Sequence, residues 1–183
     1  MHNQLNNFIL ELEGGFKVEG QSFGADISVS GEIVFCTAVS GYTESITDPS
    51  YAGQFLVFTQ PMIGNYGIPN DNKDIYGISE TFESDKPYLK AVICQEYISS
   101  KQHWEANMTL GDYLIQNNIV GLSNIDTRQL TLHIREHGSC MARIYKNDVV
   151  QPDIPEFINI AELDLVAEVS THIKQQVVTY NPI

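Results

Sequence analysis

Basic residues are scarce in this sequence of 183 residues. Only ten Lys and Arg stand against 23 Asp and Glu, which gives a formal net charge of −13 at pH 7. A charge of this sign and size repels both phosphate backbones and anionic lipid headgroups. We therefore expect neither nucleic acid nor a membrane among the partners of the protein.

Long apolar runs are also missing. No segment approaches the roughly 18 apolar residues of a membrane span, and the first ten residues, MHNQLNNFIL, lack the basic start and long apolar centre of a signal peptide. The hydrophobic fraction of 43% and the aromatic fraction of 10% are ordinary for a globular protein. These features predict a soluble cytoplasmic protein with one folded domain and an appendage.

Cysteines are few and widely spaced. The three, Cys36, Cys94 and Cys140, form no C-x-x-C pair, so the sequence predicts neither a disulfide framework nor a thiolate metal site. Cys36 and Cys94 lie inside the apolar runs EIVFCTAV and KAVICQEY, which are typical of buried strands. Glycine-rich phosphate-binding motifs are absent as well, and we expect no cofactor and no metal.

Strand patterns dominate the first half of the chain. Residues 8–18 are typical of a β-hairpin that turns at Gly14 and Gly15. Three short runs rich in β-branched and aromatic residues predict interior strands at 32–39, 55–59 and 89–94. Residues 140–145 (CMARIY) predict a further strand.

Helix signals come later. Thr109 and Asp112 form a loose capping box before a helix, and Asp126 is a good N-cap for TRQLTLHIREH, with Gly138 placed to end that helix. The order along the chain, with strands first and a mixture of helices and strands afterwards, predicts an α/β or α+β domain. We place this domain at residues 1–148 and expect residues 149–183 to form a helical connector.

Two patterns could carry catalysis. His133-Ile134-Arg135-Glu136-His137 matches the H-x-x-E-H motif of inverted zinc peptidases, in which two histidines one helical turn apart bind zinc. No third ligand accompanies them, so a solvated helix face is the favoured interpretation. Cys140 follows His137 closely, but no third group orients the histidine, and a structural thiol at the start of a strand is favoured.

The stretch GYTESITDPSYAGQ, residues 41–54, is nearly uncharged in a very acidic chain. Its glycines permit tight turns, Pro49 stiffens the path, and its hydroxyl groups suit recognition of a neutral or zwitterionic ligand. We expect an irregular but ordered loop without a catalytic acid, base or nucleophile. The alternative is a loop whose polar groups satisfy one another.

The order of three long motifs resembles a known family. GEIVFCTAVSGYTESITDPSYAGQ (31–54), TQPMIGNYG (59–67) and the DTR-containing segment 125–138 are similar to the amino-terminal domain of the small, glutamine-using chain of carbamoyl-phosphate synthase. The segment ELDLVAEVST (162–171) resembles that family's exit from the domain. The resemblance covers roughly residues 8–171.

The resemblance implies a three-layer β/β/α swivelling-type domain that docks on the large synthetase chain, in an enzyme that serves arginine and pyrimidine biosynthesis. It further implies that Ser50, in the motif DPSY, contacts the substrate glutamine beside an amidotransferase domain. We expect no catalytic residue in this chain. The candidate interface residues are Tyr42, Asp48, Pro49, Tyr51, Asn65, Asp126 and Arg128.

The family's amidotransferase domain would follow residue 183, and its cysteine motif does not occur in these residues. We therefore expect the chain to be inactive alone, although the resemblance implies that it is part of a ligase. The residues that this domain would cover predict self-association through the segment 41–67. The alternative function is a free-standing, non-catalytic binding module with the same fold.

Overall fold

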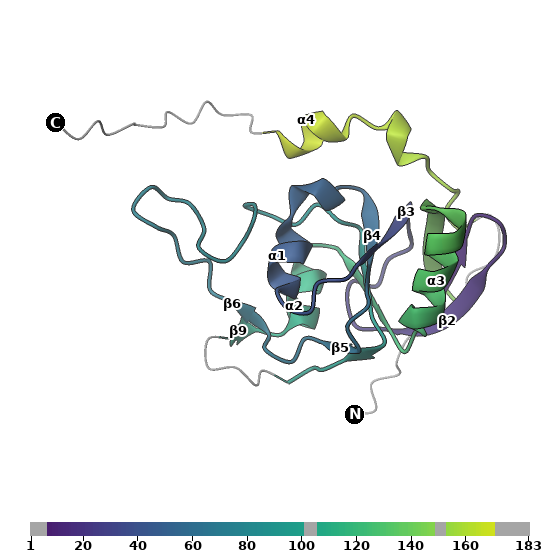
Figure 1. The fold of residues 1–183 in the computed structure, drawn as a ribbon, viewed down its shortest axis with the longest axis horizontal. Helices are drawn as coiled ribbons and strands as arrows, with labels where there is room; N and C mark the ends of the chain where they lie inside the picture. Colours follow the sequence, from purple (N-terminus) through teal and green to yellow (C-terminus); the bar gives the residue numbers. More distant parts are fainter. Residues whose placement is uncertain (1–6, 101–105, 149–152, 171–183) are drawn as a thin grey trace.

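The computed structural model describes residues 7–100, 106–148 and 153–170. Seven strands close into a barrel in the order β1-β11-β3-β4-β7-β10-β2 (Figure 1). Their bounds are β1 Asn7–Leu12, β2 Lys17–Ser22, β3 Val29–Cys36, β4 Gln54–Phe58, β7 Ala91–Ile93, β10 Val120–Ser123 and β11 Cys140–Lys146. The α/β class is thus confirmed, whereas the three-layer arrangement stays a prediction.

Short elements surround the barrel. The helical ones are α1 Tyr42–Thr47, η1 Pro49–Tyr51, α2 Leu110–Gln116, α3 Thr127–His137, η2 Ile160–Glu162 and α4 Leu165–Val169. Two small two-stranded sheets pair β5 Met62–Ile63 with β8 Glu96–Tyr97 and β6 Ile68–Pro69 with β9 Ala106–Met108. In the described parts of the chain, no helix is long and apolar enough to cross a membrane.

Half of the barrel is parallel. β3, β4, β7 and β10 run side by side in the same direction, whereas β1, β2 and β11 join antiparallel. The hairpin β1–β2 confirms the turn predicted at Gly14 and Gly15, which both have positive φ angles. The carboxyl ends of the parallel strands therefore meet at one edge, where α1 and α3 begin.

Two apolar clusters hold the fold together. The first fills the barrel, where Phe8, Ile33 and Phe55 pack with Leu130 and Ile134 of α3. The second covers the outer face of the parallel strands, where Leu56 and Val92 pack against Ile46 of α1 and Leu114 of α2. Successive residues of a strand point to opposite faces, so β4 supplies both clusters with one apolar run.

The predicted caps are confirmed. Thr109 accepts a hydrogen bond from the backbone N–H of Asp112 at 3.1 Å and begins α2, and Asp126 accepts one from Gln129 at 2.9 Å and begins α3. Gly138, with φ of 86°, ends α3. The strand predicted at 32–39 was too long, because β3 ends at Cys36 and residues 37–40 are exposed.

Candidate functional site

Most of the stretch 41–54 forms the short helices α1 and η1, which corrects the expectation of an irregular loop. Gly41 has φ of 79° and allows the chain to turn into α1, within which Thr47 donates its hydroxyl proton to the carbonyl of Thr43 at 2.9 Å. Asp48 then caps η1 by accepting a hydrogen bond from Ser50 N–H at 2.8 Å. Hydroxyl-rich residues favour turns and caps, so composition alone suggested a loop.

Two tyrosines fix α1 to the segment 64–67. Tyr42 is 1% exposed and donates its hydroxyl proton to the carbonyl of Gly67 at 2.7 Å, while its ring stacks on Tyr66 with centroids 4.1 Å apart. The Tyr66 hydroxyl accepts hydrogen bonds from the backbone N–H groups of Gly41 and Tyr42. Burial raises the pKa of both phenols. Tyr42 therefore supports the stretch 41–54 from inside. Because its side chain is buried, it is not available to contact a partner.

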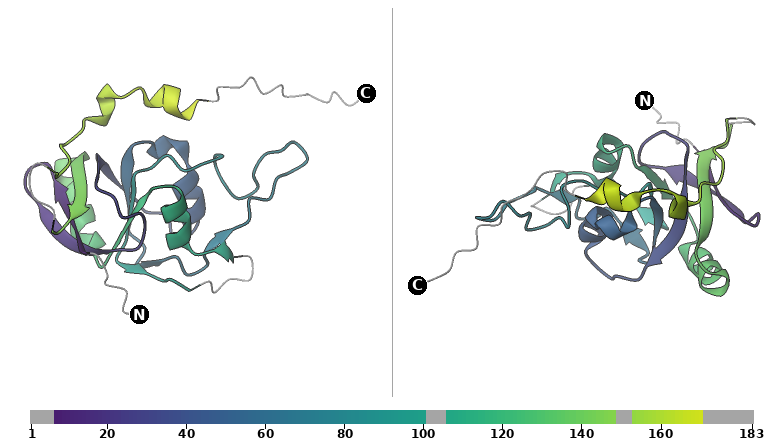
Figure 2. Two further views of the ribbon diagram at one scale, coloured as in Figure 1. Left: turned by 180° about the vertical axis from the view of Figure 1, so that it is seen from behind. Right: turned by 90° about the horizontal axis from the view of Figure 1, so that it is seen from above.

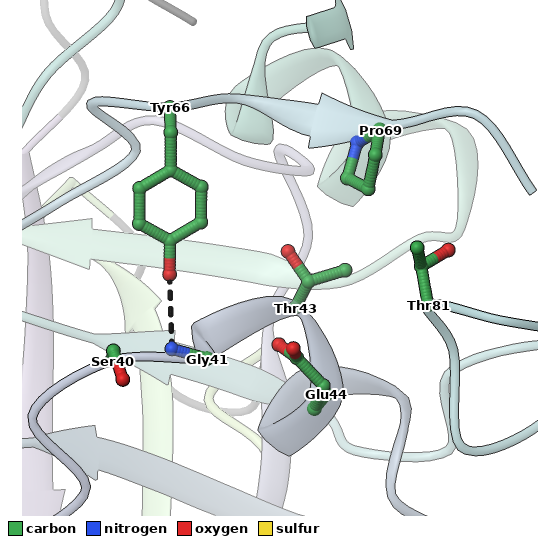
Figure 3. A pocket seen from close by; sticks show the side chains of 7 residues that line it. All are labelled: Ser40, Gly41, Thr43, Glu44, Tyr66, Pro69 and Thr81. Atoms are coloured by element: carbon green, nitrogen blue, oxygen red, sulfur yellow. Dashed lines mark hydrogen bonds between the residues drawn. The ribbon is translucent and has the colours of Figure 1, made fainter. Parts of the chain in front are cut away.

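A hollow of about 420 Å³ lies beside α1 (Figure 3). Thr43 points into it, and its Oγ1 is buried without a hydrogen-bond partner among the described residues. The exposed Glu44 lies next to it on α1, and Tyr66 and Pro69 form the facing side. The exposed carboxylate of Glu44 accepts hydrogen bonds, so the hollow suits a ligand that carries N–H or O–H donors.

Ser50 lies outside this hollow, on the surface of η1. Its backbone N–H is bound to Asp48, and its hydroxyl makes no hydrogen bond with the described part of the chain. Pro49 and Tyr51 flank it and are half-buried. Burial, followed by the neighbouring Cys36 thiol, raises the pKa of Tyr51. Ser50 is thus presented from a turn whose backbone is held firmly on both sides.

Residues 153–170 return across the barrel and pass this stretch (Figures 1 and 2). Arg143 donates to the carbonyl of Pro155 at 3.1 Å and lies 4.4 Å above the ring of Phe157. Ile160 is 9% exposed, and it lies with Leu165 about 3.5 Å from the point where a Cβ of Gly53 would stand. The segment 153–170 therefore contacts the end of the stretch that carries Ser50.

Sequence reasoning missed the charged cluster that holds Arg143, the residue that binds the segment 153–170. Glu11 accepts hydrogen bonds from Arg143 and from the Tyr145 hydroxyl, at 3.1 and 2.8 Å, and Lys17 lies 3.3 Å away. Burial raises the pKa of Glu11, but hydrogen bonds from Arg143, Tyr145 and Lys17 outweigh it, so the pKa is lowered from 4.5. The only signal was Arg143 within the apolar strand 140–145.

The remaining predicted residues, Asn65, Asp126 and Arg128, lie on other segments than η1. Asn65 is half-buried, and its Oδ1 has no hydrogen-bond partner in the described segments. Asp126 is engaged as the cap of α3, and the exposed Arg128 lines a second groove that shares no lining residue with the hollow beside α1. The structure thus distributes the candidate residues over two regions.

A family model for the carbamoyl-phosphate synthase small chain, CPSase domain, matches residues 10–144. The chain belongs to this family. A similar protein is the multifunctional protein pyr1-3 of Dictyostelium discoideum, which is 48% identical over 164 residues, covering 88% of this chain and 7% of that protein. The carbamoyl phosphate synthase arginine-specific small chain of Eremothecium gossypii is 43% identical over 161 residues, covering 87% of this chain and 40% of that one.

The chain therefore spans well under half the length of these two relatives. Among solved structures, an aminopeptidase from an Aneurinibacillus strain is 14% identical with a TM-score of 0.39, and it covers 79% of this chain and 30% of its own. That likeness is too low to carry an argument about fold or function.

The histidines that suggested a zinc site stack on each other in this family member. The ring centroids of His133 and His137 lie 4.3 Å apart, and Phe16 stacks on His133 at 4.9 Å. His137 Nδ1 lies 2.9 Å from the carbonyl oxygen of His133. In the described ranges, no cluster of three or more metal-ligating side chains occurs. The arrangement fits an aromatic stack on a helix face.

The three thiols occupy structural positions. Cys36 ends β3 and Cys94 follows β7, and both are buried, as the apolar runs predicted. Cys140 begins β11 and is half-buried. Burial raises the pKa of Cys94, and burial together with the neighbouring Glu13 and Glu32 raises that of Cys140. A raised pKa lowers the thiolate fraction, which disfavours nucleophilic reactivity.

Proposed function

We propose that this chain forms the amino-terminal part of the small chain of a glutamine-hydrolysing carbamoyl-phosphate synthase. In this role it docks on a large synthetase chain and completes the glutamine site of an amidotransferase domain. The family match over residues 10–144 supports the proposal. The domain border near residue 148, with a connector after it, belongs to the same proposal.

The observation that carries the proposal is the position of Ser50. The hydroxyl is exposed and unbonded within the described chain, while Asp48 and Pro49 hold the backbone beneath it. A pre-positioned hydroxyl binds a polar substrate without a large loss of side-chain freedom. Ser50 can therefore supply one contact to a glutamine whose other contacts come from a neighbouring domain.

This chain contributes binding and position in the proposed reaction. An amidotransferase domain hydrolyses glutamine, and the ammonia released is used by the synthetase chain to make carbamoyl phosphate. The buried Cys36 and Cys94 and the raised pKa of Cys140 support a non-catalytic role for these residues. The Eremothecium gossypii relative is an arginine-specific small chain, which favours arginine biosynthesis, and pyrimidine biosynthesis is the other proposed use.

The test compares Ser50→Ala with wild type in the assembly of this chain, an amidotransferase domain and a synthetase chain. We expect KM for glutamine to rise about tenfold, because one hydrogen bond to a polar substrate is lost. Carbamoyl phosphate formation from added ammonia should stay unchanged. Ser99→Ala, at another exposed serine, is the control. An unchanged KM in Ser50→Ala would show that Ser50 does not contact glutamine.

A further inference from the structure

A second groove lies where the parallel strands of the barrel end. Thr59 directly follows β4, and Gln95 comes soon after β7. These two residues and several residues of α3, which follows β10, line a groove of about 400 Å³. This volume lies within the range of small-molecule sites, about 300–1,000 Å³. In α/β sheets, ligands bind preferentially outside the carboxyl ends of parallel strands. The groove thus occupies a favoured place for a ligand.

The groove holds two of the three arginines of the chain. Arg128 and Arg135 are two helical turns apart on α3, so they lie on one face of it. Both are exposed, and neither forms an ion pair with any described residue. The third arginine, Arg143, is bound to Glu11 at 2.9 Å. Two guanidinium groups without an ion-pair partner in the described ranges therefore line one groove of a protein with a net charge of −13.

Guanidinium groups bind oxyanions through pairs of parallel N–H donors, which match the geometry of carboxylate and phosphate. The side-chain amide of Gln95, which also lines the groove, makes no hydrogen bond with the described chain and adds a neutral donor. Leu132, 48% exposed, gives the groove an apolar patch between the two arginines. The lining thus combines charge, a neutral donor and apolar surface.

We propose that this groove is an oxyanion-binding site, with Arg128 and Arg135 as the ligands of a carboxylate or phosphate group. The proposal does not depend on the proposed function. The anion is either a small free molecule or an acidic side chain of a protein segment, and both use the same chemistry. The net charge of −13 repels anions, so binding at this groove depends on the two guanidinium groups.

The test is an NMR titration of the isotope-labelled chain at low salt with three probes: inorganic phosphate, glutarate and an acetylated hexaglutamate peptide. We expect at least one probe to shift the backbone amides of Thr59, Gln95 and Thr131. Arg128→Gln and Arg135→Gln should each weaken binding about tenfold. The probe that binds tightest distinguishes a free anion from an acidic peptide.

The matched control is the double variant Lys73→Gln with Lys86→Gln, which removes two positive charges, one more than either single arginine substitution. Both lysines lie in the exposed segment 70–88, on the side of the molecule away from α3 (Figures 1 and 2). The control should bind like wild type. Equal weakening in the control, or no response to any of the three probes, would overturn the proposal.

Discussion

At the scale of single residues, Glu11 joins the barrel to the segment that crosses it. Its carboxylate is 7% exposed and accepts bonds from Arg143 and Tyr145, and Arg143 in turn holds the carbonyl of Pro155. A buried carboxylate is stable only when such donors compensate its lost hydration. Removal of Glu11 would leave Arg143 without its anionic partner.

We expect Glu11→Gln to lower the free energy of unfolding by about 1–3 kcal/mol at pH 7. The folded-state pKa of Glu11 lies below 4.5, so its contribution is full above that pH and is lost as pH falls through the folded-state pKa. The difference between Glu11→Gln and wild type should therefore shrink in acid. Urea unfolding at pH 7 and pH 3 measures it, with the exposed Glu13→Gln as control. A difference that is the same at both pH values would contradict this account.

Sequence could not predict this cluster. Glu11 and Tyr145 are 134 residues apart, and only the antiparallel pairing of β1 with β11 brings them together. Asp126 is the opposite case, because a capping residue acts on the backbone three positions away. Local chemistry was therefore predictable, and the charged contact between distant strands was not.

At the scale of elements, β3 and the turn before β4 touch through glycines. A Cβ at Gly31 would overlap the carbonyl oxygen of Gly53 and stand about 3.0 Å from the ring of Phe55. Gly31 is buried and pairs with Ala142 of β11. The absence of a side chain at Gly31 thus lets the end of the Ser50 stretch lie close against the barrel.

We expect Gly31→Ala to destabilise the fold by about 1–3 kcal/mol, because the added methyl group overpacks a rigid contact. Denaturant unfolding of Gly31→Ala beside Ser28→Ala, an exposed neighbour, measures the effect. Amide exchange should also quicken at Gly53, whose N–H donates to the carbonyl of Tyr88 at 3.2 Å. Wild-type stability in Gly31→Ala would show that the contact is loose.

The elements themselves were largely predictable. Apolar runs and caps identified β4, β7, α2, α3 and β11, since each depends on local pattern. The short helices α1 and η1 were missed, because hydroxyl-rich residues favour turns. The distant Tyr66 supports the start of α1, and Asp48 caps η1. Strands of two residues, such as β5 and β6, leave too little pattern to detect.

At the scale of the whole molecule, closure of the barrel depends on pairs that no local pattern contains. β1 joins β11, and β2 joins β10, across most of the chain. The groove lined by Arg128 and Arg135 lies at one edge of the closed barrel. The stretch with Ser50 lies beside the segment 153–170. The family motifs named Ser50 and Arg128 as candidates, whereas the groove that Arg128 shares with Arg135 became visible only in the three-dimensional structure.

Docking on a synthetase chain is the central claim about the molecule. Light scattering on this chain mixed with a purified large synthetase chain, with and without a separately expressed amidotransferase domain, tests it most directly. Light scattering on this chain alone measures the predicted self-association and serves as the reference. We expect a complex whose mass equals one copy of each chain. Absence of any complex at low salt would contradict docking and favour a solitary binding module.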